Sequence, residues 1–416
     1  MSRTPEVIFF ENLRRGDVAL VGGKNSSLGE MVQELDKLGV SVPPGFATTA
    51  EAFRRFIREN SLDEMISDTM KRLDAGKITL HEAGTKVRAA IAAGDWPAET
   101  AEEIGAAYKE LSGRAGKTAL SVAVRSSATA EDLPDASFAG QQETFLNIEG
   151  EEALLKACRD CFASLFTDRA ISYRNAKGFD HLDVALSVGV QQMVRSDIGG
   201  SGVMFSIDSD SGFDKVVVIN AAWGLGENVV QGAVTPDEFQ VYKPFLDNPK
   251  LTPIIERKLG AKEKKMIYAG KTDPGPVKNV PTSKAERESF VLSDDEVMEL
   301  ARQAATIETH YGLPMDMEWA RDGETGKLFI VQARPETVQS RMDSAALKSF
   351  TIGAHGRRLI TGLSVGEQIA TGRICLIEDV ADIDKFVDGA VLVTSTTDPD
   401  WVPIMKRASA IVTDHG

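Results

Sequence analysis

Apolar and polar residues alternate over 315–320. A polar connector with two glycines joins this segment to 328–335, which begins with an apolar run and alternates from Val331 onward. Alternate side chains of a strand face opposite ways, so the pattern predicts a β-hairpin. Its apolar face comprises Met315, Met317, Trp319, Phe329, Val331 and Ala333. The opposite face carries Asp316, Glu318, Gln332 and Arg334. This polar face is either an ordinary solvent-exposed strand surface or a site in which oxygen ligands hold Mg²⁺ and a guanidinium holds phosphate.

The same patterning separates helical from extended segments elsewhere. It predicts mostly helical structure over 61–115 and one helix over 293–312. Strands are expected at 120–124, 144–148, 184–194 and 215–222, and the lysine-rich stretch 245–290 is expected to be irregular. Residues 7–60 are predicted to form a strand, a glycine loop and two helices, the first of them capped by Ser26 and running to Leu35.

The final part of the chain has a different pattern. A polar stretch near 336–346 is typical of a linker, and glycine-punctuated apolar runs then predict a small β-rich unit. With 416 residues, the chain is long enough for two or three domains with a substantial core.

Composition narrows the classes of protein to consider. The net charge of −15 argues against a nucleic-acid-binding surface, although a local basic pocket for a polyanion remains compatible with it. Three cysteines are too few for a disulfide framework, and no apolar run approaches the length of a membrane span or a signal peptide. These features predict a soluble, cytoplasmic protein without a membrane partner.

Two cysteines form a C-x-x-C pair, Cys158 and Cys161. The surrounding apolar residues recur at helical spacing, and the chain has no second cysteine pair to complete a zinc site. We therefore expect a pair of helical core residues rather than a metal or redox centre.

Three segments carry possible ligand chemistry. Lys24 follows two glycines and precedes a helix, an arrangement that suits phosphate binding but is more often an exposed turn; it is not a Walker A loop. Arg125 ends an apolar strand and is followed by a hydroxyl-rich loop to residue 142, which is either a lid over phosphates or an ordinary surface loop. The stretch 223–230 has the glycines of a dinucleotide fingerprint without its third glycine or its βαβ setting, so we discount a Rossmann site.

Together these segments resemble the nucleotide-binding half of the phosphoenolpyruvate synthase family. The resemblance covers essentially the whole chain and rests on several matches in the same order. They are the segments 21–31, 124–132, 137–141, 222–232, 317–319 and 331–335.

The resemblance implies an α+β fold in which an ATP-grasp nucleotide-binding domain is followed by the start of a swivelling β/α phosphohistidine domain. The ATP-grasp domain would span 1–345, with subdomains of about 1–200 and 201–345, and the incomplete swivelling domain would span 346–416. In the family a phosphoenolpyruvate/pyruvate barrel follows, and the full-length protein is expected to be a homodimer.

The implied chemistry converts ATP, pyruvate and water to phosphoenolpyruvate, AMP and phosphate through a phosphohistidine carrier, with Mg²⁺ as the metal. Lys24, Arg125 and Arg334 match phosphate-binding positions, while Glu318 and Gln332 match positions that hold nucleotide and Mg²⁺. Further ATP-contacting positions match Gly140, Thr144 and Gln191. Strand parity adds Asp316 as a carboxylate behind the metal site or at a second metal.

The sequence departs from the family at the group that accepts the phosphoryl. The carrier histidine lies in a run like Thr-Asp-x-Gly-Gly-x-Thr-Cys-His, and Thr413 begins such a run here, so that His415 falls at a variable position. The chain is therefore expected to be a fragment that binds Mg·ATP without making phosphoenolpyruvate itself.

Two other interpretations stay open. Another dikinase of this architecture, a pyruvate phosphate dikinase or a rifampin phosphotransferase, would share the nucleotide site. A non-catalytic regulatory module that keeps an ATP-grasp shell would bind nucleotide without turnover.

Overall fold

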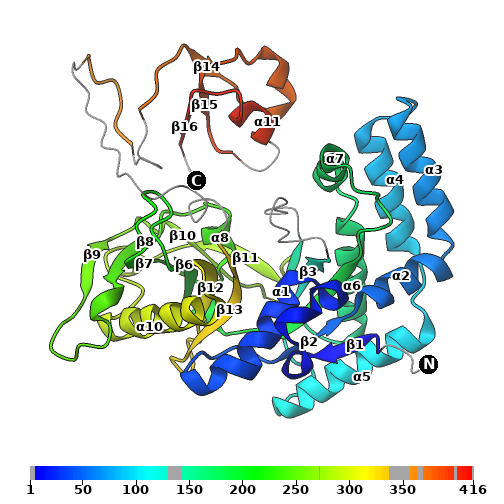
Figure 1. Ribbon diagram of the computed structural model, residues 1–416, viewed down its shortest axis with the longest axis horizontal. Helices are drawn as coiled ribbons and strands as arrows, with labels where there is room; N and C mark the ends of the chain where they lie inside the picture. Colours follow the sequence, from blue (N-terminus) through cyan, green and yellow to red (C-terminus); the bar gives the residue numbers. More distant parts are fainter. Residues whose placement is uncertain are drawn as a thin grey trace. The chain divides into compact units, whose positions relative to one another are not determined.

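The computed structural model describes residues 5–129, 143–270, 272–336, 356–362, 369–397 and 401–414 (Figure 1). The chain divides into two compact units. The first comprises Met1–Gly199, Met266–Val280 and Glu318–Arg334, and the second Gly200–Lys265, Pro281–Met317 and Pro335–Gly416. Both contain helices and sheets, which confirms the predicted α+β class.

The first unit is built on a five-stranded antiparallel sheet with the order β1-β2-β5-β3-β4. Its strands are β1 (Val7–Phe9), β2 (Gly45–Thr48), β3 (Val122–Ala128), β4 (Thr144–Ile148) and β5 (Leu186–Gln192). The three strands predicted between 120 and 194 are thereby confirmed to within a few residues.

Seven α-helices belong to the described part of this unit. They are α1 (Val18–Glu30), α2 (Ala50–Glu59), α3 (Leu62–Asp74), α4 (Leu80–Ala93), α5 (Ala98–Arg114), α6 (Glu151–Ser164) and α7 (Asp168–Lys177). The side chains of Thr49, Thr79 and Thr167 accept the backbone N–H that caps α2, α4 and α7. The helical prediction for 61–115 is confirmed by α3, α4 and α5.

The two faces of this sheet differ in chemistry. Val188 and Val190 of β5 belong to an apolar core with residues of α2 and α6, including a cluster of Phe53, Phe56 and Phe162. The alternate residues of β5 face α1 and are small or polar. A strand sandwiched between helices in this way is buried on both faces, as β5 is along almost its whole length.

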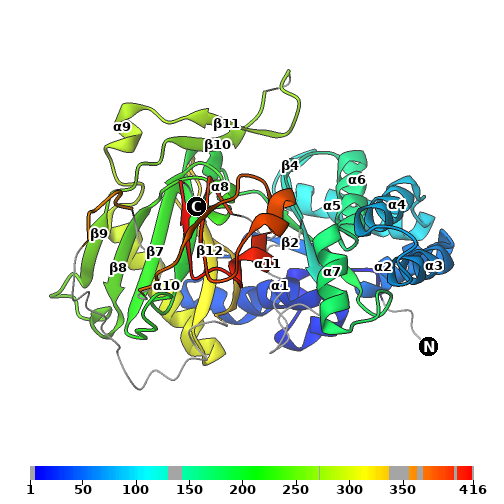
Figure 2. The same cartoon turned by 90° about the horizontal axis from the view of Figure 1, so that it is seen from above.

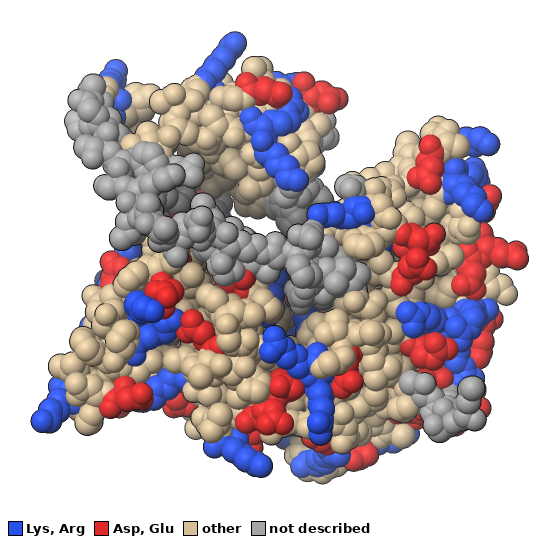
Figure 3. Space-filling view, viewed as in Figure 1, with Lys and Arg blue, Asp and Glu red and all other residues tan. Residues whose placement is uncertain are grey.

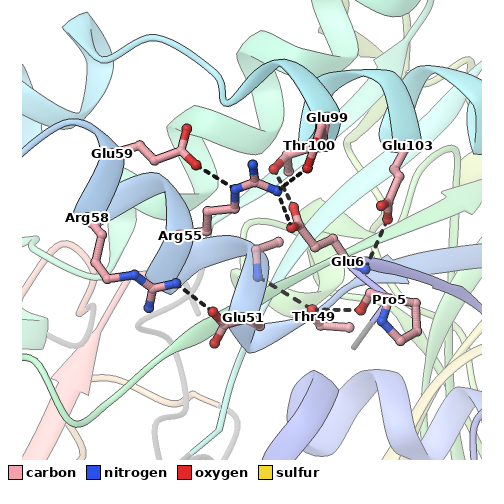
Figure 4. A network of polar contacts seen from close by, with 11 residues as sticks. Pro5, Glu6, Thr49, Glu51, Arg55, Arg58, Glu59, Glu99, Thr100 and Glu103 are labelled. Atoms are coloured by element: carbon pink, nitrogen blue, oxygen red, sulfur yellow. Dashed lines mark hydrogen bonds and ion pairs between the residues drawn. The ribbon is translucent and has the colours of Figure 1, made fainter. Parts of the chain in front are cut away.

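A buried carboxylate anchors the start of the chain (Figure 4). Glu6 is only 2% exposed and accepts from Arg55 of α2 at 2.8 Å and from the hydroxyl of Thr100 of α5. Its backbone N–H donates to Glu103, and its carbonyl accepts from the N–H of Thr49. Hydrogen bonds to carboxylates raise the pKa of Arg55 above its usual range. The network ties the segment before β1 to two helices.

Helix α1 differs from its prediction. It begins at Val18 and is interrupted at Gly22, whose φ of +74° is left-handed, so Lys24 lies in the first turn after the break. Ser26 does not cap a helix start, because its hydroxyl donates to the carbonyl of Gly23 inside the helix. The segment Met31–Leu35 then continues as one π-helical turn.

The second unit contains four antiparallel strands in the order β6-β7-β8-β9. They are β6 (Gly200–Phe205), β7 (Val216–Trp223), β8 (Asp237–Tyr242) and β9 (Ile254–Lys258), and the short helix α8 (Glu227–Val230) follows β7. Helix α10 (Asp294–Tyr311) packs against β7 and β8 (Figure 2). Ser293 forms a capping box with Glu296 at its start, which confirms the helix predicted for 293–312.

The irregular structure predicted for 245–290 is wrong. That stretch contains β9, β10 (Lys264–Tyr268), β11 (Val277–Pro281) and the short helix α9 (Lys284–Arg287). The prediction took the lysines of this stretch as a sign of exposed, irregular chain. One of them, Lys262, is instead fully buried. Lys262 donates to Asp237, which also accepts the N–H groups of Gly260 and Val291.

The predicted hairpin is confirmed as β12 (Met315–Arg321) and β13 (Leu328–Pro335). Its predicted apolar face holds for β12 but fails in part for β13. Phe329 and Val331 are only half-buried, whereas Leu328 and Ile330 are buried. The N–H of Ile330 donates to the carbonyl of Ser41, so another segment of the chain lies beside β13 at this point.

The C-terminal residues form a small parallel sheet, β14 (Ile374–Leu376), β15 (Val391–Thr394) and β16 (Ala410–Thr413), with the order β14-β15-β16. The predicted β-rich unit is thereby confirmed, and the short helix α11 (Val402–Met405) adds Ile404 to its core. Most of the predicted linker lies outside the described residues.

Cys158 and Cys161 are buried in α6, which confirms a helical core pair. Burial raises the pKa of both thiols. None of the helices described has the length and apolar character that a membrane crossing needs. On the face shown in Figure 3, basic and acidic side chains are interspersed.

Replacement of Lys262 by Met should destabilise the second unit, because the carboxylate of Asp237 would stay buried without its cation. We expect a loss of about 3–5 kcal/mol in the free energy of unfolding, measured by urea denaturation. The double variant Lys262→Met/Asp237→Asn should recover much of the loss. Lys258, which pairs with Glu238 and has a side chain that is 57% exposed, is the control. Lys258→Met should lower the free energy of unfolding by less than about 1 kcal/mol. Equal effects of the two lysine variants would contradict the prediction.

His181 should make stability depend on pH. Its Nδ1 accepts from Arg174, and burial together with the charge of Arg174 lowers the pKa of His181 below 6.5, against the opposing charges of Asp74 and Asp180. Below pH 6.5 the unfolded chain therefore takes up a proton that the folded chain resists. We expect the free energy of unfolding to decrease as the pH is lowered below 6.5, until the pH lies below the pKa of His181 in the folded chain. His181→Gln should flatten this slope between pH 7 and 5; an unchanged slope would exclude His181 as its source.

Candidate functional site

Four of the residues predicted to bind ligand line one cavity in the first unit. They are Lys24, Arg125, Gln191 and Gln332, from α1, β3, β5 and β13. The cavity has a volume of about 10 Å³, room for roughly one water molecule. Its other lining residues are Phe10, Asn25, Leu28, Ser126 and Gly189. Residues more than 300 positions apart in the chain are thus brought to one point.

The close approach of α1 to the sheet places Lys24 there. Gly22 packs on the backbone of Ser127, and a Cβ at Gly22 would lie 2.7 Å from the carbonyl oxygen of Ser127. A Cβ at Gly189 would lie 2.3 Å from the Oδ1 of Asn25. The amide of Asn25 donates to Ser187 of β5 at 2.9 Å. Glycine at both positions and a buried amide between them therefore fix the helix on the sheet.

Arg125 lies inside β3 rather than at its end, because the strand continues to Ala128. Its side chain is 19% exposed, and Nη1 donates to the carbonyl of Val331 at 3.0 Å. Nη2 lies 3.7 Å from Oε2 of Glu318. The guanidinium therefore joins the first unit's sheet to the polar face of the hairpin.

Glu318 and Gln332, which the two-residue alternation of side chains predicted to share a face, lie side by side. The Nε2 of Gln332 donates to Oε1 of Glu318 at 3.1 Å. Gln332 is 8% exposed and the side chain of Glu318 is 22% exposed. The amide oxygen of Gln332 is the atom of this side chain that can coordinate a cation.

The other predicted residues have different surroundings. Gln191 is buried and donates to the carbonyl of Pro43 at 3.3 Å. Thr144 pairs with Arg125 across the β3–β4 ladder. Arg334 is half-buried near the end of β13.

Asp316 is half-buried and precedes Glu318 by two positions in β12. It therefore lies on the same face of the strand. Gly140, the rest of the matched segment 137–141 and His415 lie outside the described residues.

The donors at the cavity suit Mg²⁺ only as part of a larger set. Among the residues described, no group of three or more His, Cys, Asp or Glu side chains could hold a metal ion. Glu318 and Gln332 offer two hard oxygens, and Mg²⁺ commonly takes one or two protein ligands with the remainder from phosphates and water. The residues therefore fit a metal that arrives with a polyphosphate.

Sequence reasoning missed Asn25, Ser27 and Gly189. The hydroxyl of Ser27 donates to the carbonyl of Ala333 at 2.9 Å. Gly189 interrupts an apolar strand, and such a glycine often marks close approach by another backbone or side chain. That signal could have found it, whereas nothing in the pattern distinguishes Ser27 from Ser26.

The glycines at 224 and 226 do not form a dinucleotide site of the Rossmann type. Strand β7, which precedes them, pairs antiparallel with both β6 and β8, so the parallel βαβ arrangement is missing here. Gly224 has a left-handed φ of +85°, and its carbonyl accepts from the hydroxyl of Ser201 at 2.6 Å. As the sequence predicted, this turn lacks the strand arrangement of a Rossmann site.

Comparison with known proteins gives two family matches. Residues 18–352 match the model of the pyruvate phosphate dikinase AMP/ATP-binding domain, and residues 386–416 match the mobile domain of PEP-utilising enzymes. The predicted family resemblance is thereby confirmed.

Among curated relatives, the phosphoenolpyruvate synthase of Synechocystis sp. is 52% identical over 427 residues, and that of Neisseria meningitidis serogroup B is 53% identical over 413. The phosphoenolpyruvate synthase of Escherichia coli (strain K12) is 52% identical over 415 residues. Each alignment covers 99% of this chain and 52% of the relative. The chain thus spans about half the length of these relatives.

Gly189→Ala should loosen α1 from the sheet, because the new methyl group would overlap the side-chain amide of Asn25. We expect a loss of about 1–3 kcal/mol in the free energy of unfolding by urea denaturation. The control is Gly113→Ala in α5, where a Cβ would meet nothing within 4 Å. There alanine should be neutral or stabilising by up to about 1 kcal/mol. Similar losses in both variants would show that contact with Asn25 is not the cause.

Proposed function

Because the chain belongs to the pyruvate phosphate dikinase AMP/ATP-binding domain family, we propose that it binds Mg·ATP as the nucleotide-binding part of a phosphoenolpyruvate synthase. In this proposal residues 1–345 form an ATP-grasp domain, with subdomains of about 1–200 and 201–345. Residues 346–416 begin a swivelling phosphohistidine domain, in keeping with the second family match.

One observation carries the proposal. Lys24, Arg125, Gln191 and Gln332 line the same small cavity, and Glu318 is hydrogen-bonded to one of them. Two cations, two amides and a carboxylate at one point match what a polyphosphate with its metal requires. An ordinary exposed strand surface would not bring side chains from α1, β3, β5 and β13 together.

Each of these residues has a role in the proposal. Lys24, Arg125 and Arg334 neutralise the phosphates, with Lys24 acting as a compact charge and the two arginines as planar forks. Glu318 and Gln332 would hold Mg²⁺, with Asp316 behind them. Gln191, Thr144 and Gly140 contact the remainder of the nucleotide.

The chemistry of this arrangement is alignment and charge neutralisation. The bound metal would draw charge from the phosphate oxygens, which lowers the barrier to attack at phosphorus. Arg125 and Lys24 supply fixed positive charge toward the same oxygens without reorganisation during the reaction. An imidazole carrier would attack the β-phosphorus in line, so that AMP leaves and the carrier receives the pyrophosphoryl group, from which water would release phosphate.

For the longer protein we propose the conversion of ATP, pyruvate and water to phosphoenolpyruvate, AMP and phosphate through such a carrier. The choice of water over phosphate as co-substrate rests on relatives at 52–53% identity that are named phosphoenolpyruvate synthase. Pyruvate, a homodimeric assembly and a cytoplasmic location belong to the same proposal.

Calorimetric titration of this chain with Mg·ATP tests the nucleotide site. The parent should bind, and Glu318→Ala and Arg334→Ala should each weaken binding by about ten- to a hundredfold, since each removes a hydrogen-bonding or coordinating charge. Glu324→Ala is the matched control, because this carboxylate lies in the turn of the same hairpin, is 60% exposed and pairs with Arg195. Its affinity should equal that of the parent.

Removing Mg²⁺ with EDTA should weaken ATP binding by the parent. It should change ATP binding by Glu318→Ala much less, because that variant has already lost a metal ligand. A folded parent that shows no heat of binding with Mg·ATP would refute the proposed nucleotide site. If Glu318→Ala binds Mg·ATP as tightly as the parent, Glu318 is not a metal ligand of the site.

A further inference from the structure

The two peptide carbonyls that flank Gln332 are both held by side chains from other elements. Arg125 of β3 donates to the carbonyl of Val331 at 3.0 Å, and Ser27 of α1 donates to the carbonyl of Ala333 at 2.9 Å. Such bonds limit the freedom of the strand to slide or rotate. Gln332 is therefore presented from a strand that is fixed on both sides.

The bond of Ser27 is unlike those of two other serines in the helices of this unit. Ser26 donates to Gly23 and Ser164 donates to Cys161, in each case three residues back in the same helix. This local pattern is common for helical serines. Ser27 instead reaches a strand 306 residues further along the chain. Its hydroxyl therefore links α1 to β13, which a hydrogen bond within the helix does not do.

Ser27 also lies at the right place on α1 to couple two parts of the site. It follows Lys24 by three positions, so the two side chains lie on the same side of the helix, one turn apart. Lys24 lines the cavity, and Ser27 donates to the carbonyl of Ala333, the residue between Gln332 and Arg334. One hydrogen bond therefore sets the offset between the lysine and the hairpin residues.

We propose that Ser27 is a positioning residue of the nucleotide site. It holds β13 at a fixed offset from α1, so that Gln332 and Arg334 meet the same polyphosphate as Lys24. This role rests on the proposed function, because it concerns the site at which Mg·ATP would bind. Ser27 itself need not touch the nucleotide.

The test compares Ser27→Ala, Ser27→Thr and Ser164→Ala with the parent. Mg·ATP affinity is measured by calorimetry, and hydrogen–deuterium exchange is followed in peptides covering 328–335. Ser27→Ala should bind about three- to tenfold more weakly, the effect of one lost hydrogen bond, and its β13 amides should exchange faster. Ser27→Thr, which keeps the hydroxyl, should restore both properties. Ser164→Ala also removes a buried hydroxyl bond from a helix and should leave both unchanged.

The outcomes separate this inference from the proposed function. If the parent binds Mg·ATP and Ser27→Ala binds within twofold of it, the positioning role is overturned. It is also overturned if Ser164→Ala weakens binding as much, because the effect would then be general destabilisation. A folded parent that does not bind Mg·ATP overturns the proposed function and the role of Ser27 in it. The exchange data then still show whether Ser27 holds β13.

Discussion

The site depends on how closely α1 approaches the five-stranded sheet. Gly22 and Gly189 leave no room for a Cβ, and the amide of Asn25 fills the space above Gly189 while donating to Ser187. A buried amide is costly without partners, so this contact is specific as well as tight. It stabilises one orientation of the helix, in which Lys24 lies in the first turn after the break at Gly22. The lysine is therefore placed by packing rather than by the flexibility of its glycine turn.

The same orientation of α1 extends the constraint to the hairpin. Ser27 holds one carbonyl beside Gln332 and Arg125 holds the other, while Arg125 also lies 3.7 Å from Glu318. Side chains that touch the hairpin thus come from both a helix and a strand of the first unit. Under the proposed function, binding of a flexible polyanion would gain from this arrangement, because the cost of ordering the protein is met on folding and not at each binding event.

The sequence was sufficient for the chemistry of the hairpin and insufficient for its packing. The two-residue period of a strand was enough to put Glu318 and Gln332 on one face of the hairpin, because that period depends on backbone geometry. The hydrogen bond between them was found in the structure. The two-residue alternation could not foresee that Ile330 would be buried or that its N–H would donate to the carbonyl of Ser41, far away in the chain. Lys262 was misjudged for a similar reason. Its partner Asp237 and the backbone donors around it belong to separate elements, and a buried lysine is indistinguishable from an exposed one by pattern.

The limited ligand set of the protein has a consequence for how metal and nucleotide would bind. The described residues offer no cluster of three metal-binding side chains, and Glu318 is already hydrogen-bonded to Gln332 and close to the charge of Arg125. A nearby cation lowers the affinity of a carboxylate for a second cation. Phosphate oxygens can accept hydrogen bonds from Arg125 and at the same time complete the coordination of Mg²⁺. Each ligand would therefore improve the site for the other, so metal and nucleotide affinities should be coupled reciprocally.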